Sequence, residues 1–452
     1  MRKFVIFIGL VVFYPSFGYG YIPMPLDSPV VVDYSSAGLS TGLSQGRGTA
    51  RDSHGWIYAV YLIDSNDLVC CSRSTDNGRT WTRFANLSGA WSAFPNIAID
   101  RGDSIYVDWE RQPLDTIGRD IYFSKYNGVF WIPPVDVSNE HEQGGSLASS
   151  SLALDGRGML HLIWLGYGPD IWYSYYTKNV WTTPENVTQG SGTWVASMCA
   201  DTASNLHLAW QGWQTMYKER TSGVWGVTEQ ACPTQGYAPS IATDLECRAL
   251  VAYDDSAIHI AYIMRDNTGW SKPYPISDTI GRFPSITCDK YGRLYVVWGG
   301  PERLQKLWYA TYDGTAWSAP VRLRNDTAYA DYDSRLGFPV SDSGVDLIWT
   351  RDRPGGGYQV MYWRLPLLPV GVEEYKGFEG SRVQGFKITP NPFTSFARVA
   401  GLEGERFDLY DITGRRVGTY RGDRVGEGLA AGVYFLRTEN GASKPVRIVK
   451  VR

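Results

Sequence analysis

The clearest pattern in this chain is a short apolar segment that ends in an aspartate and recurs along the sequence. In the best copies a small polar residue stands four positions before the aspartate, and a large apolar residue stands three positions before it. The aspartates, of which the first and last belong to weaker copies, are Asp52, Asp100, Asp155, Asp201, Asp244, Asp289 and Asp342. Such self-similarity is typical of repeat proteins in which each copy is one supersecondary unit.

An aromatic residue follows each aspartate at a nearly fixed distance. It stands nine positions later in the earlier copies, as at Trp298, and seven positions later in the last copy, at Trp349. The turn residues and β-rich run between the two predict strand, tight turn, strand. A third, aromatic segment such as 307–310 and a fourth that begins with tryptophan, such as Trp317, follow. Four strands repeated seven times predict an all-β fold with a seven-bladed β-propeller.

The two ends of the repeat region complement each other. The seventh copy has no fourth-strand tryptophan after Trp363, whereas a spare apolar run, 30–34, precedes the first copy. A four-stranded unit cannot bury both of its faces alone, so neighbouring units must stack, and a closed ring protects the sheet edges. We therefore expect the run 30–34 to complete the seventh unit and to close the ring.

The first twenty residues have the layout of a secretory signal. Arg2 and Lys3 precede an apolar run that is too short to span a bilayer, and small residues precede an expected cleavage between Gly20 and Tyr21. The mature chain is therefore expected to lack a transmembrane segment. The expected organisation is a signal peptide at 1–20, a propeller at 21–365, a linker at 366–384 and a small C-terminal β-sandwich at 385–452.

Composition and the absence of certain motifs argue against several functions. The net charge is -3 and acids and bases are interspersed, so the sequence has no basic patch of the kind that binds nucleic acid. Among the six cysteines, no pair has the spacing of a zinc site, and a disulfide between Cys232 and Cys247 is one open possibility. No P-loop, dinucleotide fingerprint or nucleophile elbow is present. We expect no cofactor, no bound metal and a monomer.

One hairpin of the first copy carries a longer motif, Ser74-Thr75-Asp76-Asn77-Gly78-Arg79-Thr80-Trp81. It resembles the Asp-box, or bacterial neuraminidase repeat. The resemblance implies a sialidase-like propeller in which Ser74, Asp76, Gly78 and Trp81 hold the hairpin. A sialidase also carries a Phe/Tyr-Arg-Ile-Pro motif near its start. The segment 281–284 is only remotely similar to this motif, and it lies in the sixth repeat. Sialidase activity is therefore the less favoured reading, and we lean towards a protein that is not an enzyme.

Propeller topology places the ligand face on the loops that join strand two to strand three and on those that lead to the next unit. Arginines and carboxylates there match acidic sugars, and aromatic rings stack on sugar faces. A solvated polar loop is the plain alternative for any single residue. The candidate binding residues are Glu110, Arg111, Trp213, Arg282, Glu302, Arg303, Asp331, Asp333, Arg335, Arg351 and Asp352.

The C-terminal region resembles the type A sorting domain of the type IX secretion system. The resemblance is carried by three segments in order, Pro390-Asn391-Pro392-Phe393, Tyr410-Asp411-Ile412-Thr413-Gly414-Arg415 and Ala431-Gly432-Val433-Tyr434-Phe435. It implies contact with that secretion machinery, passage through the outer membrane, and then release or attachment to the cell surface. An ordinary accessory sandwich is the alternative.

These observations favour a secreted or cell-surface propeller that binds a glycan or another extracellular polymer without catalysis. Two alternatives stay open: a sialidase-like glycoside hydrolase, and a structural or adhesive protein with a protein partner.

Overall fold

The computed structural model describes residues 28–366, apart from short gaps, together with several stretches beyond residue 381. The gaps are 39, 43–44, 65, 113–118, 139–149, 167, 169, 191–192, 290, 301–305, 315, 324–330, 338–343 and 354. The later stretches are 382–383, 386–389, 396–400, 406–411, 416–421, 424–429, 432–438 and 446–450. The chain divides into two compact units, Met1–Leu367 and Leu368–Arg452. The described residues contain no helix, so the expected all-β class is confirmed. The expected signal peptide and its cleavage point at Gly20 and Tyr21 lie outside the described residues.

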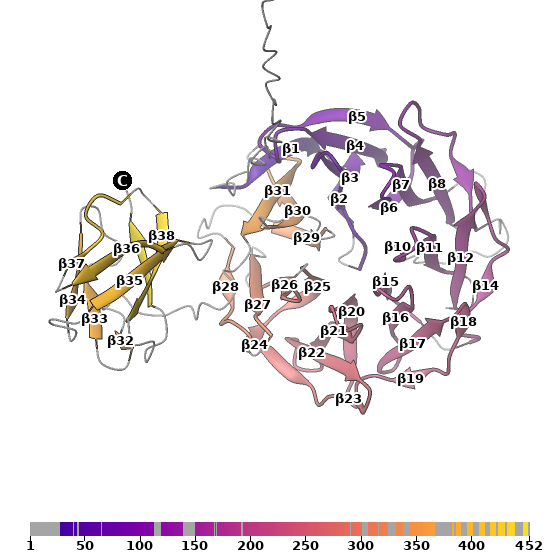
Figure 1. Ribbon diagram of the computed structural model, residues 1–452. Helices are drawn as coiled ribbons and strands as arrows, with labels where there is room; N and C mark the ends of the chain where they lie inside the picture. Colours follow the sequence, from indigo (N-terminus) through magenta and orange to yellow (C-terminus); the bar gives the residue numbers. More distant parts are fainter. Residues whose placement is uncertain are drawn as a thin grey trace, which may run out of the picture. The chain divides into compact units, whose positions relative to one another are not determined.

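The described part of the first unit forms seven small antiparallel sheets, which Figure 1 shows arranged in a ring. Sheet 1 contains β2 (Thr49–Arg51), β3 (Ile57–Ile63), β4 (Leu68–Ser74) and β5 (Thr82–Asn86). Sheet 2 contains β6 (Ser92–Ile99), β7 (Ile105–Arg111), β8 (Asp120–Tyr126) and β9 (Val135–Asp136). Sheet 3 contains β10 (Ser151–Leu154), β11 (Leu160–Leu165), β12 (Ile171–Thr177), β13 (Val180–Trp181) and β14 (Glu185–Asn186). Sheet 4 contains β15 (Ala196–Ala200), β16 (Leu206–Gln211), β17 (Thr215–Thr221), β18 (Val224–Trp225) and β19 (Glu229–Gln230).

The remaining sheets follow the same order. Sheet 5 contains β20 (Gly236–Thr243), β21 (Ala249–Asp255), β22 (His259–Asp266), β23 (Gly269–Trp270) and β24 (Tyr274–Ile280). Sheet 6 contains β25 (Arg282–Cys288), β26 (Leu294–Gly299), β27 (Leu307–Tyr312) and β28 (Val321–Arg322). Sheet 7 contains β29 (Asp331–Leu336), β30 (Gly344–Asp352), β31 (Tyr358–Pro366) and β1 (Val30–Ser35). In each sheet the strand that comes first along the repeat lies nearest the centre of the ring (Figure 1).

Successive sheets pack face to face through the apolar side chains of their strands. Strand β3 is buried along its whole length because its side chains alternate between two neighbours. Val60 and Leu62 pack with residues of sheet 2, whereas Ala59 and Tyr61 pack with residues of sheet 7. Equivalent apolar clusters lie between all other successive sheets. The cluster between sheets 7 and 1 closes the circle.

The N-terminal strand β1 completes sheet 7, as the apolar run 30–34 predicts. It pairs antiparallel with β31, and the register places Val30 opposite Tyr362 and Tyr34 opposite Gln359. Sheet 7 therefore consists of three strands from the end of the unit and one strand from its beginning. This confirms the expected closure by the two ends of the repeat region.

A segment that the sequence did not single out lies inside the ring. We call the described residues of 36–48 (all but 39 and 43–44), which lie between β1 and β2, the central segment. Figure 1 shows the coil before β2 running towards the middle. The Arg47 guanidinium donates to the carbonyls of Leu336 in sheet 7 (3.2 Å) and Ile241 in sheet 5 (3.5 Å). The Arg47 carbonyl accepts the N–H of Ile97 in sheet 2 (3.0 Å). Because burial dominates around its side chain, the pKa of Arg47 is lowered to about 10. The central segment thus links sheets from different sides of the ring.

The small polar residue of the repeat forms a hydrogen bond between the inner strands of neighbouring sheets. Its hydroxyl oxygen accepts a backbone N–H from the innermost strand of the next sheet. The pairs are Ser151 with Met198 (3.1 Å), Ser197 with Ile241 (3.3 Å), Ser240 with Ile286 (3.2 Å) and Ser285 with Leu336 (3.1 Å). Adjacent sheets are not joined by a continuous ladder at the centre, so these hydroxyls satisfy backbone groups that would otherwise lie buried without a partner.

The described part of the second unit forms two four-stranded antiparallel sheets. One contains β32 (Arg382–Val383), β33 (Phe386–Thr389), β34 (Ala397–Ala400) and β37 (Arg424–Val425). The other contains β36 (Arg416–Arg421), β35 (Arg406–Asp411), β38 (Gly432–Thr438) and β39 (Val446–Lys450). Buried residues of both sheets, such as Val399 and Leu436, belong to one apolar cluster. Of the sorting-domain segments, Tyr410–Asp411 ends β35 and Gly432–Phe435 lies in β38, while the opening segment 390–393 lies outside the described residues.

All six cysteines are free thiols, so the open possibility of a Cys232–Cys247 disulfide is not realised. Cys232 Sγ donates to the Tyr253 hydroxyl (3.1 Å), and Cys247 Sγ lies 3.2 Å from Thr202 Oγ1. Within the described stretches, no helix has the length and apolar character needed to cross a membrane.

Candidate functional site

Two kinds of loop share one face of the ring, which we call the mouth face. They are the loops from the second to the third strand of a sheet and the loops from one sheet to the next. The central segment enters the ring from this face, because it leads into the first strand of sheet 1. Among the described residues, most of the predicted binding residues belong to the mouth face or to the strand ends beside it, whereas Arg335 lies near the other end of its strand. The structure separates them into buried and exposed groups.

Three of the predicted charged residues in sheet 7, Asp331, Arg335 and Arg351, are buried. Asp331 Oδ1 accepts from both Arg351 Nε (2.7 Å) and Trp349 Nε1 (2.8 Å), so this acid holds two neighbours of β30. Arg335 is also buried, and it donates to the carbonyls of Thr41 (2.8 Å) and Pro95 (2.5 Å). These contacts use the charged groups within the fold, where they connect sheet 7 with the central segment and sheet 2.

Other predicted residues at sheets 6 and 7 give less information. Glu302 and Arg303 lie outside the described residues, and Asp333 is described only as part of β29. Asp352 is half-buried at the end of β30. The dense cluster that the sequence suggests here is therefore not assembled from described side chains, and its role in binding stays a prediction.

Glu110 and Arg111 end β7 in sheet 2. Glu110 is buried and accepts from Arg119 Nη1 (3.3 Å). Burial raises the pKa of Glu110 well above its usual value, because the Arg119 charge offsets only part of the desolvation. The Arg111 guanidinium lies 5.5 Å from the centre of the Tyr122 ring. Trp91, 53% exposed, is held beside them, since its carbonyl accepts the Gln112 N–H (3.0 Å).

Of the predicted residues whose side chains the structure describes, Trp213 and Arg282 are the exposed ones. Trp213 is 88% exposed at the tip of the turn between β16 and β17, and Arg282 is exposed at the start of β25. Neighbouring aromatic residues that the sequence analysis did not select are also exposed on the mouth face: Trp194 at 62% and Phe283 at 43%. Their place in the repeat could have identified them. Each of these aromatic residues, and also Trp91, stands at or just before the first strand of a sheet, where the chain enters from the mouth face.

A buried acid and an amide support strained backbone at this face. Asp254 Oδ1 accepts the N–H of Phe283 (3.0 Å), and Gln211 Oε1 accepts the N–H of Ala238 (3.0 Å). Phe283 and Ala238 have φ of 55° and 47° and lie at bulges of β25 and β20. Burial raises the pKa of Asp254 to about 8, although the Phe283 N–H and the nearby Arg282 charge act in the opposite direction. A carboxyl with this pKa is mostly protonated near neutral pH.

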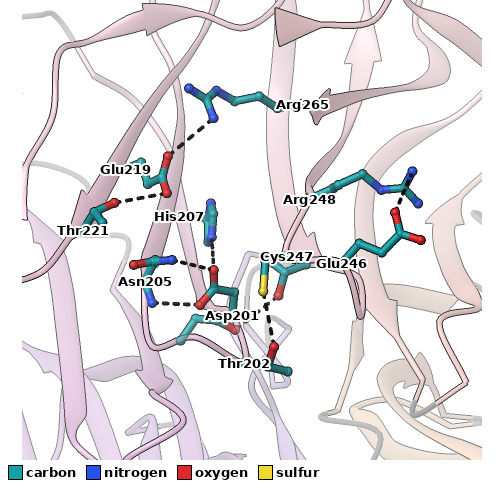
Figure 2. Close-up of polar contacts among 12 residues, drawn as sticks. Asp201, Thr202, Asn205, His207, Glu219, Thr221, Glu246, Cys247, Arg248 and Arg265 are labelled. Carbon is teal, nitrogen blue, oxygen red and sulfur yellow. Dashed lines mark hydrogen bonds and ion pairs between the residues drawn. The ribbon is translucent and has the colours of Figure 1, made fainter. Parts of the chain in front are cut away.

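The opposite face carries the described aspartates of the repeat, and their role is structural. Figure 2 shows Asp201, whose carboxylate accepts from the Asn205 backbone N–H (2.8 Å) and from its side-chain amide (2.9 Å). Its Oδ2 also lies 3.3 Å from His207 Nε2. Asp100, Asp155, Asp244 and Asp289 accept backbone N–H groups two and four residues later in the same way. The repeated acid therefore closes the turn between the first two strands.

The hairpin with the Asp-box pattern is held by the residues named for it. The Ser74 hydroxyl accepts the Gly78 N–H (2.8 Å) and donates to Asp76 Oδ1 (2.8 Å). Trp81 Nε1 donates to the Gly78 carbonyl (3.1 Å), and the Trp81 ring packs against the Tyr362 ring at 5.0 Å. The turn of sheet 1 is thus fixed against sheet 7, and it contributes to closure rather than to the mouth face.

No group of three or more potential metal ligands occurs among the residues that the structure describes. Among the described residues, the mouth face offers exposed aromatic rings, amides, the exposed Arg282 and the buried acids Glu110 and Asp254, together with other charged side chains such as Arg119 and Asp170.

Comparison with known proteins gives a fold but no family. No family model matches the chain, and no curated protein matches it in sequence. These comparisons therefore lend no support to the Asp-box or sorting-domain resemblance. Among solved structures, the neighbours include sialidase, polysaccharide lyase and lectin folds of the β-propeller type.

An ulvan lyase of polysaccharide lyase family 25, bound to a GlcA(1-4)Rha3S ligand, superposes with a TM-score of 0.53 at 10% identity. The match covers 75% of this chain and 96% of the lyase. A Hadza microbial sialidase has a TM-score of 0.44 at 10% identity, covering 67% and 73%. A variant of the Aleuria aurantia lectin with a bound fucoside has 0.43 at 14%, covering 64% and 99%. The likeness to the lyase shows a shared fold and nothing about the ligand.

Proposed function

We propose that the first unit is a seven-bladed β-propeller that binds a glycan, or another extracellular polymer, at its mouth face without catalysis. The observation that carries this proposal is that the mouth-face ends of sheets 2, 4 and 6 expose aromatic side chains: Trp91, Trp194, Trp213 and Phe283. Large aromatic side chains left exposed often mark ligand-binding regions, because their removal from water on binding is favourable. Stacking on the apolar faces of sugar rings gives such side chains a partner. That carbohydrate-binding and carbohydrate-active proteins occur among the structural neighbours is in keeping with this proposal.

Substitution of Trp213 tests the proposal. We expect Trp213→Ala to weaken binding to polysaccharides by at least about tenfold, which corresponds to about 1.4 kcal/mol. Affinity electrophoresis of the purified chain through gels that contain each polysaccharide provides the measurement. Phe130→Ala is the matched control, since Phe130 is 57% exposed but lies in the loop between β8 and β9, on the opposite face. Equal effects of the two substitutions would contradict a site on the mouth face.

Asp254 supports a second candidate function, a sialidase-like glycoside hydrolase. A buried carboxyl with a pKa of about 8 beside an exposed arginine has the protonation state that a general acid needs. A fluorogenic sialoside assay tests this candidate. Turnover that is lost in Asp254→Asn and in Arg282→Ala, with both variants folded, favours the hydrolase over the non-catalytic protein.

For export, we propose that residues 1–20 direct secretion and that residues 385–452 act as a type IX sorting domain. The chain then reaches the cell surface or the medium. The support is the signal layout and the order of the three C-terminal segments. In a host with this secretion system, deletion of 385–452 is expected to keep the protein inside the outer membrane. Surface labelling of the truncated chain at the level of the full chain would refute the sorting role.

A further inference from the structure

We infer that the mouth loops of sheet 4 form a subsite for an uncharged sugar residue, so that the preferred ligand is a neutral rather than an acidic polysaccharide. This inference rests on the proposed glycan binding and names the substrate class for one part of the same face.

The first observation is the turn that presents Trp213. Strands β16 and β17 pair up to Gln211 and Thr215, so only three residues form the connection. The Gly212 N–H donates to the Gln214 carbonyl (2.9 Å), and Gln214 Nε2 donates to the Pro233 carbonyl of the next loop (3.2 Å). The indole therefore stands on a short, braced turn rather than on a long loop. A fixed aromatic platform loses little conformational entropy when a ligand stacks on it.

A second indole is tied to the same strand end. The Trp194 N–H donates to the Gln211 carbonyl (3.0 Å), and the Gln211 N–H donates to the Val195 carbonyl (2.8 Å). Trp194 therefore lies beside the start of the turn whose tip carries Trp213. Two exposed indoles held by one hydrogen-bonded frame are suited to successive units of a polymer.

The third observation is that the loop segments around these indoles contain no charged residue of their own. The sequence segments 187–195, 211–215 and 230–237 contain no Asp, Glu, Lys, Arg or His. Their polar groups are amides and hydroxyls, which donate to and accept from sugar hydroxyls equally well. Two charged side chains from neighbouring strands and loops contact the first segment: Asp170 accepts the Gly190 N–H and the Thr188 hydroxyl, and Lys218 donates to the Val187 carbonyl (2.8 Å). The three segments supply no cation of their own to the carboxylate of an acidic sugar, and the nearby Asp170 carboxylate would repel it, whereas a neutral sugar leaves no charge unpaired.

Side-chain amides near these indoles can still form hydrogen bonds with a ligand. Gln211 uses its Oε1 to brace Ala238, and no described residue accepts from its Nε2. Gln235 is exposed in the loop that follows β19. By contrast, the mouth loops at sheets 2 and 6 carry Arg111 and Arg282, so an anionic ligand would select those sheets instead.

The test uses the full chain and two sets of probes. Laminarin, galactomannan and dextran represent neutral polysaccharides, and polygalacturonate and alginate represent acidic ones. Binding is measured by affinity electrophoresis at about 0.05 M and about 0.5 M NaCl, because charge–charge attraction is strongly screened over this range. The variants are Trp194→Ala, Trp213→Ala, Arg282→Ala and the control Phe130→Ala, each checked for an unchanged unfolding transition.

We expect binding to at least one neutral polymer, with little change between the two salt concentrations. We expect a loss of at least about tenfold in each tryptophan variant and no loss in Arg282→Ala. Binding restricted to acidic polymers, weakened by salt and lost in Arg282→Ala but not in Trp213→Ala, would overturn this inference and leave glycan binding intact. Binding to no polymer in either set would overturn the proposed function as well.

Discussion

The serine hydroxyls between the inner strands offer a sharp test of what holds the ring together. In the Ser240→Ala variant, the Ile286 N–H loses the hydroxyl that accepts it at 3.2 Å. Both residues are buried, so water cannot easily replace the lost partner. A buried donor left without an acceptor costs about 1–3 kcal/mol, and the loss of one methyl-sized group adds little. We expect the free energy of unfolding to fall by about 2 kcal/mol.

Ser271→Ala is the matched control. Ser271 Oγ accepts the Met264 N–H at 3.1 Å, with the same chemistry and a similar distance, but it lies exposed on the outer side of sheet 5. Water can take over this hydrogen bond, so we expect a loss below about 0.5 kcal/mol.

Urea unfolding followed by tryptophan fluorescence measures both variants, and an unchanged m-value shows that the difference lies in stability. If the two substitutions cost the same, or if Ser240→Ala costs less than about 0.5 kcal/mol, the inner hydroxyls do not link the sheets in the way we describe.

Three further predictions follow from closure and from the buried acid. Deletion of 21–36 removes β1 and should lower the melting temperature strongly, whereas deletion of 21–27, which ends before β1, should leave it nearly unchanged. Gly78→Ala should destabilise by more than about 2 kcal/mol, because φ is +87° and an added Cβ would lie 2.2 Å from a buried tyrosine ring. Gly128→Ala, at φ +93° with open space around it, should cost only about 1 kcal/mol; equal losses would show that the contact with sheet 7 is unimportant. Because the folded-state pKa of Asp254 is about 8, its contribution to stability is present below the ordinary pKa of about 3.9 and is lost as the pH rises towards 8. Asp254→Asn should therefore lose less stability than the parent chain between about pH 5 and about pH 8, and parallel pH profiles would contradict this.

Much of the fold was predictable because it depends on local chemistry that repeats. Most of the repeat aspartates, such as Asp100, Asp155 and Asp244, close a turn by accepting backbone N–H groups two and four residues later. Each aromatic anchor lies on the strand that follows. Such interactions leave a trace at fixed sequence spacing. The completion of sheet 7 by 30–34 was also predictable. The seventh repeat had no fourth strand of its own, and the apolar run 30–34 belonged to no repeat.

The candidate site was harder to predict because charge in a sequence does not reveal burial. Arg335, Asp331 and Arg351 have the composition of a binding site, yet their charged groups are used inside the fold. Conversely, Trp194 resembles a core residue in sequence, although its indole reaches solvent.

The sequence by itself determined the all-β class, the repeating unit and the pairing of the two ends, because these follow from periodicity and short-range turns. The tertiary structure decided which polar residues meet across the ring, how the central segment spans it and which aromatic rings stay exposed. The physical reason is that these features depend on contacts between residues tens to hundreds of positions apart. No local pattern encodes whether a given side chain will find a partner in the neighbouring sheet or remain available to a ligand.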